Sequence, residues 1–322
     1  MASKASALTE VSILELEDFL YAVEDPSGTP TSRKVSLARI LGLIAPRNDF
    51  RLTTESGVPV SSSDRAAQGT LYLTPRLTGA TSGLITLFDG TRHFMRKISQ
   101  ISLSLTGLLT NAKPHDFFLD DDGATMSAIA WTDDVTRASA LAAEGNLLVL
   151  GSDHTKLYLG TGYASGTGTI EDTAAKRWLW NAFNRVRRPL ARVDTTNSWT
   201  YNGAFRQANN SGANQVDVVV GLNESMVELT ALGTANGSTT ITYGVGVGLD
   251  STTVNSAQIF AGMVSTMTTG NLAVTAHYRG LPGLGRHFLA WLEKSSAATT
   301  TWYGDNNDGT ERQSGLVGSI EG

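Results

Sequence analysis

Short apolar runs separated by turn signals recur along most of the chain and predict β-strands. In the run at 101–105, apolar residues alternate with serines, which is the period of a strand with one buried face. Asp-Gly pairs, which favour tight turns, follow the runs at 84–88 and 115–119. Antiparallel β-sandwiches show strands at this spacing with turns between them. Further strands are predicted at 69–73, 126–131, 147–150, 215–220, 239–248, 273–278 and 288–292.

The N-terminal segment, residues 1–45, is predicted to form a hairpin and one short helix. Two strands, at 19–23 and 31–35, precede Ser36, which is positioned to cap a helix over 37–41. An isolated hairpin is only marginally stable in water. Its apolar side chains therefore require cover, either from the rest of the chain or from a partner.

The pattern from 173 to 188 predicts an amphipathic helix. At 100° per residue, alanine, tryptophan, leucine, phenylalanine and valine side chains gather on one face, and arginine and asparagine side chains take the other. Asp172 is positioned to cap the start of this helix. Trp180 lies towards the polar face with Arg177 and Arg188, which is a composition typical of an interface. The alternative is that a loop of the same domain covers Trp180.

Three glycines alternate with valines in the predicted strand near residue 245. Gly244, Gly246 and Gly248 strip one strand face of side chains, which suits the close approach of another backbone. We expect a neighbouring subunit to provide this cover. Because the N-terminal hairpin also needs a covering partner, we predict a homotrimer.

The sequence is divided into three parts, at 1–45, 46–195 and 196–322. The fold class is therefore mainly β: an anchor hairpin, a central antiparallel sandwich with one helix, and a sandwich-like C-terminal domain.

Composition narrows the possible functions. The 322 residues carry a formal net charge of −5, which opposes binding to nucleic acid or to an anionic membrane. There is no cysteine, which excludes disulfides and thiolate metal sites. No apolar run is long enough for a membrane-spanning helix, and the N-terminus lacks the apolar core of a signal peptide. We therefore expect synthesis in a cytoplasm without membrane insertion.

Candidate catalytic and metal-binding patterns are weak. The acidic runs at 120–123 and 305–309 do not fit the ligand register of a calcium loop, and turns explain them better. No nucleophile elbow or phosphate-binding loop is present, and the adjacent carboxylates at 133–134 would face opposite sides of a strand. No catalytic residue, metal or cofactor is therefore predicted. Aromatic residues in polar surroundings suggest sugar stacking, although burial is the usual state of tryptophan: Trp199, Tyr201, Trp291, Trp302 and Tyr303.

Several stretches resemble the fibre and appendage proteins of tailed bacteriophages. The stretch at 18–30, with 34–38 after it, is similar to the N-terminal virion-attachment segment of many such proteins. A second group of stretches resembles a module that recurs in head-fibre and tail-fibre proteins: 86–91, 157–161, 171–172, 176–181 and 187–190. The resemblance covers most of residues 10–200. It indicates a class of role but identifies no active site.

The resemblance implies a non-enzymatic, trimeric, β-rich protein of the virion. Its N-terminus would dock on portal, tail or capsid components, and its C-terminal part would contact a glycan or protein of the host surface. The docking residues expected on the N-terminal segment are Phe19, Leu20, Val23, Leu37 and Ile40. Two alternatives remain open at this point: a head or neck decoration protein without a receptor, and a tail-associated polysaccharide depolymerase.

Overall fold

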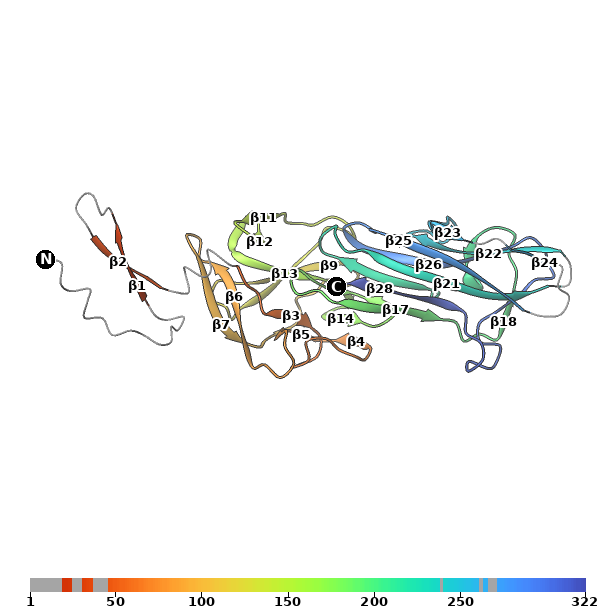
Figure 1. The fold of residues 1–322 in the computed structure, drawn as a ribbon, viewed down its shortest axis with the longest axis horizontal. Helices are drawn as coiled ribbons and strands as arrows, with labels where there is room; N and C mark the ends of the chain where they lie inside the picture. Colours follow the sequence, from red (N-terminus) through yellow and green to blue (C-terminus); the bar gives the residue numbers. More distant parts are fainter. Residues whose placement is uncertain (1–18, 25–30, 37–45, 238–239, 261–262, 266–270) are drawn as a thin grey trace.

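Figure 1 shows the computed structural model, in which strands follow one another along the chain. The part of the chain that the structure describes contains one 3-10 turn at Ala208–Asn210 and no α-helix. The prediction of a mainly β protein is therefore confirmed. The structure describes residues 19–24, 31–36, 46–237, 240–260, 263–265 and 271–322.

The C-terminal unit consists of two sheets packed face to face. The first sheet contains β15 (Lys176–Arg177), β19 (Arg206–Gln207), β20 (Gln215–Val220), β22 (Ile241–Leu249), β24 (Met263–Ser265) and β26 (Gly285–Ser295). The second contains β17 (Arg187–Val193), β18 (Ser198–Thr200), β21 (Val227–Asn236), β23 (Ile259–Phe260), β25 (Leu272–Gly280), β27 (Thr301–Tyr303) and β28 (Gly315–Glu321). The strand orders are β15-β20-β26-β22-β24 and β17-β28-β21-β25-β23.

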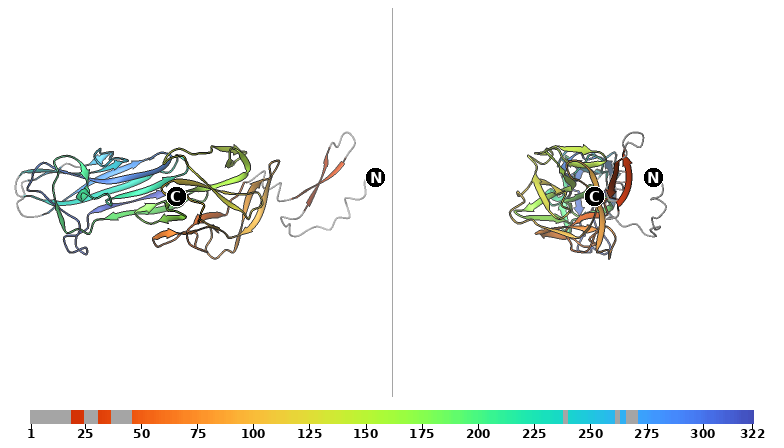
Figure 2. Two further views of the ribbon diagram at one scale, coloured as in Figure 1. Left: turned by 180° about the vertical axis from the view of Figure 1, so that it is seen from behind. Right: turned by 90° about the vertical axis from the view of Figure 1, so that its left-hand side faces the viewer.

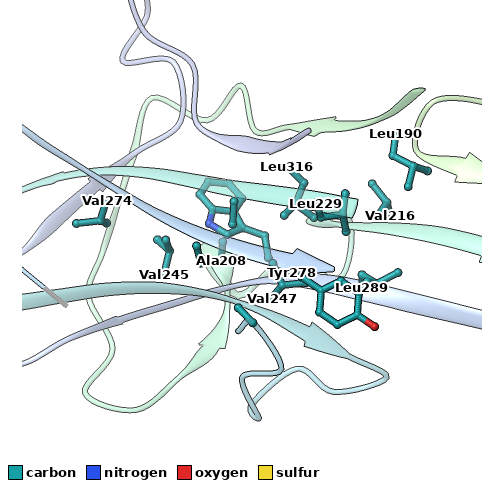
Figure 3. Close-up of a cluster of buried hydrophobic side chains, with 14 of the residues drawn as sticks. Leu190, Ala208, Val216, Leu229, Val245, Val247, Val274, Tyr278, Leu289 and Leu316 are labelled. Atoms are coloured by element: carbon teal, nitrogen blue, oxygen red, sulfur yellow. The ribbon is translucent and has the colours of Figure 1, made fainter. Parts of the chain in front are cut away.

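Side chains from alternate positions of both sheets fill the space between them (Figure 3). Val216 of β20 and Val245 and Val247 of β22 lie in the same buried cluster as Leu229 of β21 and Val274 of β25. Removing such side chains from water is worth about 25 cal/mol per Å² of apolar surface, so this cluster is the main source of stability of the unit. Alternate valines of β20 and β22 thus face this core.

Besides the short β15, the C-terminal unit takes β17 from the region assigned by sequence to the central part. β17 pairs with β28 along its whole length, from Arg187 opposite Glu321 to Val193 opposite Gly315. Leu190 of β17 is fully buried in the core between the two sheets. The structure therefore places residues 187–193 in the C-terminal unit.

The central unit is built mainly of antiparallel strands. Its strands are β3 (Phe50–Thr53), β4 (Arg65–Gln68), β5 (Thr70–Pro75), β6 (Ser82–Phe88), β7 (His93–Ser99), β8 (Ile101–Ser104), β9 (Pro114–Leu119), β10 (Met126–Ala130), β11 (Leu141–Glu144), β12 (Leu147–Leu150), β13 (Asp153–Gly166), β14 (Thr169–Asp172) and β16 (Leu179–Asn181). The sheet β3-β5-β8 and the pair β6–β7 share one buried cluster with β9 and β13. β14 pairs with β15, and β15 pairs in parallel with β20, so a continuous sheet connects this unit to the C-terminal unit (Figures 1 and 2).

The prediction of a helix over 173–188 is wrong, because these residues form β15, β16 and the start of β17. Side chains on both sides of the backbone are buried. Trp178 and Trp180 point into one cluster, whereas Leu179 points into the central core. A strand directs successive side chains to opposite faces, whereas an amphipathic helix buries one stripe. Because a buried cluster lies on each side of residues 178–180, an extended strand buries more of their side chains than a helix would.

The N-terminal segment contains a two-stranded antiparallel sheet. β1 (Phe19–Glu24) pairs with β2 (Thr31–Ser36), from Phe19 opposite Ser36 to Glu24 opposite Thr31. In Figure 1 this pair lies beyond the β6–β7 end of the central unit. The helix predicted over 37–41 falls outside the described residues.

The alternating glycines of β22 do allow another backbone to approach closely, and the same chain provides it. A Cβ at Gly246 would collide with the side chain of Asn255, and one at Gly248 with the backbone of Ser251. The covering loop is fixed by the Asn255 side chain, whose Oδ1 accepts from the Val247 N–H at 3.1 Å. The expectation that a neighbouring subunit covers these two positions is therefore wrong. The homotrimer stays a prediction.

Candidate functional site

Trp180 lies at the junction of the two units and is fully buried. Its indole Nε1 donates a hydrogen bond to Ser225 Oγ at 2.8 Å, and its ring stacks on Tyr158 with centroids 6.5 Å apart. Val219 of the C-terminal unit belongs to the same buried cluster. The expectation that Trp180 is exposed is wrong. Its own chain covers it, as the alternative held, but Val219 and Ser225 of the C-terminal unit take part and not only a loop of its own domain. The covering residues lie some forty positions away, where the local pattern gives no signal.

Arg177 and Arg188 are buried and share one carboxylate. Asp172 Oδ1 accepts from Arg177 Nη1 at 3.1 Å, and Asp172 Oδ2 accepts from Arg188 Nη2 at 2.9 Å. Burial lowers the pKa of Arg177, and the Asp172 charge opposes this shift. Arginine stays protonated in proteins, so the three groups form a buried ion triad. Neither guanidinium is presented at the surface in the way that the predicted helix implied.

The tryptophans of the C-terminal unit are core residues. Trp291 and Trp302 are fully buried, and Trp199 is nearly so. The rings of Trp199 and Trp291 meet edge to face with centroids 6.0 Å apart. These three side chains are therefore inaccessible for sugar stacking, in agreement with the usual behaviour of tryptophan.

Glu293 of β26 is a fully buried carboxylate at the end of this core. It accepts hydrogen bonds from Trp199 Nε1 at 2.7 Å, from Arg206 Nε at 2.9 Å and from the Asn209 N–H at 3.3 Å. Burial raises its pKa to about 7, and the hydrogen bonds and the Arg206 charge only partly oppose that shift. The site therefore exchanges a proton near neutral pH.

We expect Glu293 to make the stability of the fold depend on pH between about 4.5 and 7. In this window the folded state holds a proton that the unfolded chain releases, so the free energy of unfolding falls as pH rises. The loss reaches about 3 kcal/mol above the folded pKa. Thermal melts of the wild type and Glu293→Gln across this range measure the effect. The wild type should lose stability relative to the variant as pH rises, and parallel curves would contradict the assignment.

A groove of about 610 Å³ crosses the outer face of the sheet β17-β28-β21-β25. Strand alternation directs these side chains away from the core, because the residues between them fill it. Val317, at the middle of the groove, is 61% exposed. The outward side chains of the groove are Arg187, Pro189, Glu228, Thr230, His277, Arg279, Val317 and Ser319. This face offers both apolar contact and hydrogen-bonding groups.

Glu228 organises the charged end of the groove. Its carboxylate pairs with Arg187 and, at 3.1 Å, with Arg279 Nε. Arg187 Nε also donates to Ser319 Oγ at 2.7 Å, and Thr230 Oγ1 lies 3.0 Å from His277 Nδ1. Two guanidiniums on one carboxylate leave a net positive charge that is open to solvent. Such a surface suits a ligand with carboxylate, hydroxyl or amide groups.

The other predicted features are placed as follows. Phe19, Leu20 and Val23 lie on β1, whereas Leu37 and Ile40 fall outside the described residues. The acidic runs form turns in which aspartates accept from nearby backbone N–H groups.

Two further searches cover the described residues only. No group of three or more histidine or acidic side chains able to hold a metal ion occurs among them. Within the same residues, no helix has the length and apolar character needed to cross a membrane.

Comparisons with known proteins give no family. No protein-family model matches the chain. No curated protein sequence matches it either. Among solved structures, similar chains include one of infectious bursal disease virus, at 12% identity and a TM-score of 0.25, with 86% of this chain and 72% of that chain covered.

Two Bacillus thuringiensis toxins are also similar, and this chain spans less than two thirds of each. The Cry1Da tryptic core variant is 8% identical at a TM-score of 0.17, with 96% of this chain and 58% of that chain covered. The mosquito-larvicidal Cry4Aa toxin is 11% identical at a TM-score of 0.16, with 86% and 57% covered. At these TM-scores the similarities carry no conclusion about this chain.

Proposed function

We propose that this chain is a structural fibre protein of a tailed-phage virion that attaches by its N-terminus and contacts the host surface through its C-terminal unit. The observation that carries the proposal is the open groove on the sheet β17-β28-β21-β25, where charged and hydroxyl side chains surround the exposed Val317. A broad, open sheet face suits contact with another surface more than enclosure of a small substrate.

The strands that form the groove hold its side chains in fixed positions. Glu228, Arg187 and Arg279 sit on three different strands and are joined by ion pairs across them. Side chains on regular elements are positioned more accurately than side chains on loops. The groove therefore has the preformed character of a recognition surface.

Hydrogen bonds from Arg137 and Arg286 join the two units, which supports a rigid structural role for the protein. Arg137 of the central unit pairs with Asp116 at 2.6 Å and also donates to the carbonyl of Gly221, which follows β20. The Arg286 N–H donates to the carbonyl of Asp134 at 2.8 Å, across the same junction. Arg137, whose side chain is 12% exposed, links a carboxylate of the central unit to a backbone carbonyl of the C-terminal unit, which restricts hinge motion between the units. The proposed fibre, a homotrimer in this proposal, would present the groove at a fixed angle.

Two variants introduced into the particle test the proposal. Val317→Arg places a long charged side chain in the groove at an exposed position, so it should reduce adsorption to host cells at least about tenfold without loss of the protein from the particle. Phe19→Asp with Leu20→Asp should instead give particles that lack the protein, because the apolar docking surface is lost. Adsorption rates and the protein content of purified particles are the measurements.

Leu77→Arg is the matched control, because Leu77 is 64% exposed and belongs to the central unit, outside the groove. It should change neither adsorption nor incorporation. Normal adsorption of Val317→Arg particles would reject the role of the groove, and normal incorporation of the double variant would reject the anchor. Release of reducing ends from host polysaccharide by the purified protein would favour the depolymerase alternative.

A further inference from the structure

We infer that the open surface over Gly244 is a binding site for a sugar ring that carries a carboxylate. This site goes beyond the proposed function and shares no residue with the groove. β22 and β26 of the first sheet and Phe260 of β23, at the edge of the second sheet, line it. Figure 1 shows β22 and β23 in the part of the C-terminal unit far from the central unit. The volume of the site is about 360 Å³. Pockets for small ligands begin at about this size.

Gly244 is the uncovered member of the three alternating glycines. Gly246 and Gly248 lie under the loop that follows β22, whereas among the described residues the atom nearest to a Cβ at Gly244 is Phe205 Cζ, at 3.9 Å. The missing side chain therefore leaves a floor of bare backbone beside an aromatic ring. A ligand ring can reach this backbone without displacing any side chain of the described residues.

Two phenyl rings form the walls of the pocket. Phe205 and Phe260 both line it, and Phe260 is 53% exposed. An exposed phenylalanine loses the burial that normally stabilises it, so a contact that covers its ring is favourable. The aliphatic C–H face of a pyranose offers a flat apolar surface of this kind. Phe260 is exposed and Phe205 is partly buried, whereas the tryptophans of this unit are buried.

Polar groups border the same floor. Lys294 lies directly opposite Gly244 in the β22–β26 pairing, and its Nζ is 5.9 Å from the centre of the Phe205 ring. Among the described residues no carboxylate forms an ion pair with Lys294. Thr242 and Ser296 add hydroxyl groups, with the Thr242 N–H donating to Ser296 Oγ at 2.9 Å.

Aromatic walls, one ammonium group and two hydroxyls together favour an acidic sugar. A hexuronate presents its C–H face to the phenyl rings, its hydroxyls to Thr242 and Ser296, and its carboxylate to Lys294. A purely apolar peptide side chain would form no ion pair with the ammonium group of Lys294 and no hydrogen bond with the hydroxyls of Thr242 and Ser296. A nucleic-acid strand needs several cations along its backbone, and the chain has a net charge of −5.

Ligand-observed NMR titrations with glucuronate and glucose test the site on the purified full chain. We expect saturable glucuronate binding with a dissociation constant on the order of 1 mM, which is the affinity scale of a small, shallow contact. Gly244→Val should weaken binding at least tenfold by filling the floor. The backbone of Gly244 is not left-handed and the nearest atom is at ordinary contact distance, so this variant should melt as the wild type does.

Two further variants separate the parts of the inference. Lys294→Met should reduce the affinity for glucuronate to that for glucose and leave glucose binding unchanged. Gly69→Val, at an open position of the central unit, should change nothing. Absence of saturable glucuronate binding, equal affinity in Gly244→Val, or preference for an oligothymidylate over glucuronate would each overturn the inference. The groove variant Val317→Arg should bind glucuronate normally, which keeps this test independent of the adsorption experiment.

Discussion

Replacement of Trp180 by alanine is expected to lower the free energy of unfolding by about 3–5 kcal/mol, the cost of emptying a large buried aromatic site. The indole fills the space between Tyr158 and Val219, which belong to different units. Its loss also leaves Ser225 without its buried donor. Both units should be affected, because the cavity opens at their junction. Urea denaturation followed by far-UV circular dichroism measures the change.

Two milder variants divide this effect. Ser225→Ala keeps the indole in place and removes its hydrogen bond, together with a longer one from Arg185 Nη1 at 3.4 Å. It should cost about 1 kcal/mol or somewhat more, because the indole N–H is left buried. Trp180→Phe keeps most of the packing and should fall between Ser225→Ala and Trp180→Ala. A loss below about 1 kcal/mol for Trp180→Ala would mean that the side chain is not buried at the junction.

The strands whose own residues alternate were predictable from the sequence. β20 occupies the predicted residues 215–220, and β22 and β25 lie within a few residues of their predicted positions. In β25 one face meets the core and the other does not, and in β20 and β22 alternate valines line the same core, so the apolar runs report these strands. The turns around the acidic runs were predictable for a similar reason, since aspartate and glycine act locally.

The segment around Trp180 was not predictable from its own pattern. Its side chains on both faces are buried, one face by the central core and the other by residues some forty positions later, so period two is hidden. Arg177 and Arg188 pair with the buried Asp172, but their spacing in the sequence is the same as that of arginines on the solvated face of a helix. β13 was missed because glycines interrupt its apolar run; at Gly160 φ is +155° and a Cβ would collide with the Trp180 carbonyl.

The candidate sites were hidden from the sequence for a different reason. The groove combines side chains from β17, β21, β25 and β28, which are more than a hundred residues apart at the extremes. Single residues of this kind, such as an exposed valine or a surface arginine, carry no signal until the sheet places them together. For Gly244 a signal existed in the alternating glycines, and its meaning depended on which of the three the chain itself covers.

Replacement of Asp172 by alanine should be about as destabilising as loss of Trp180. Asp172 is the carboxylate partner of both Arg177 and Arg188, and all three side chains are buried. Without it, two guanidiniums would face each other in a site with little access to water. Removing one partner from a buried ion network costs about 3–5 kcal/mol, since the remaining charges lose their compensation. Equilibrium unfolding in urea gives the value.

The neighbouring residue supplies the control. Glu171 pairs with Lys176 at 3.1 Å in a more exposed setting, so Glu171→Ala should cost at most about 1 kcal/mol. A triple variant with Asp172→Leu, Arg177→Met and Arg188→Met removes all three charges and should recover much of the loss, because apolar side chains of similar volume avoid the desolvation cost. If Asp172→Ala costs no more than Glu171→Ala, the two arginines must reach other partners or solvent. The description of Asp172, Arg177 and Arg188 as a buried ion triad would then be wrong.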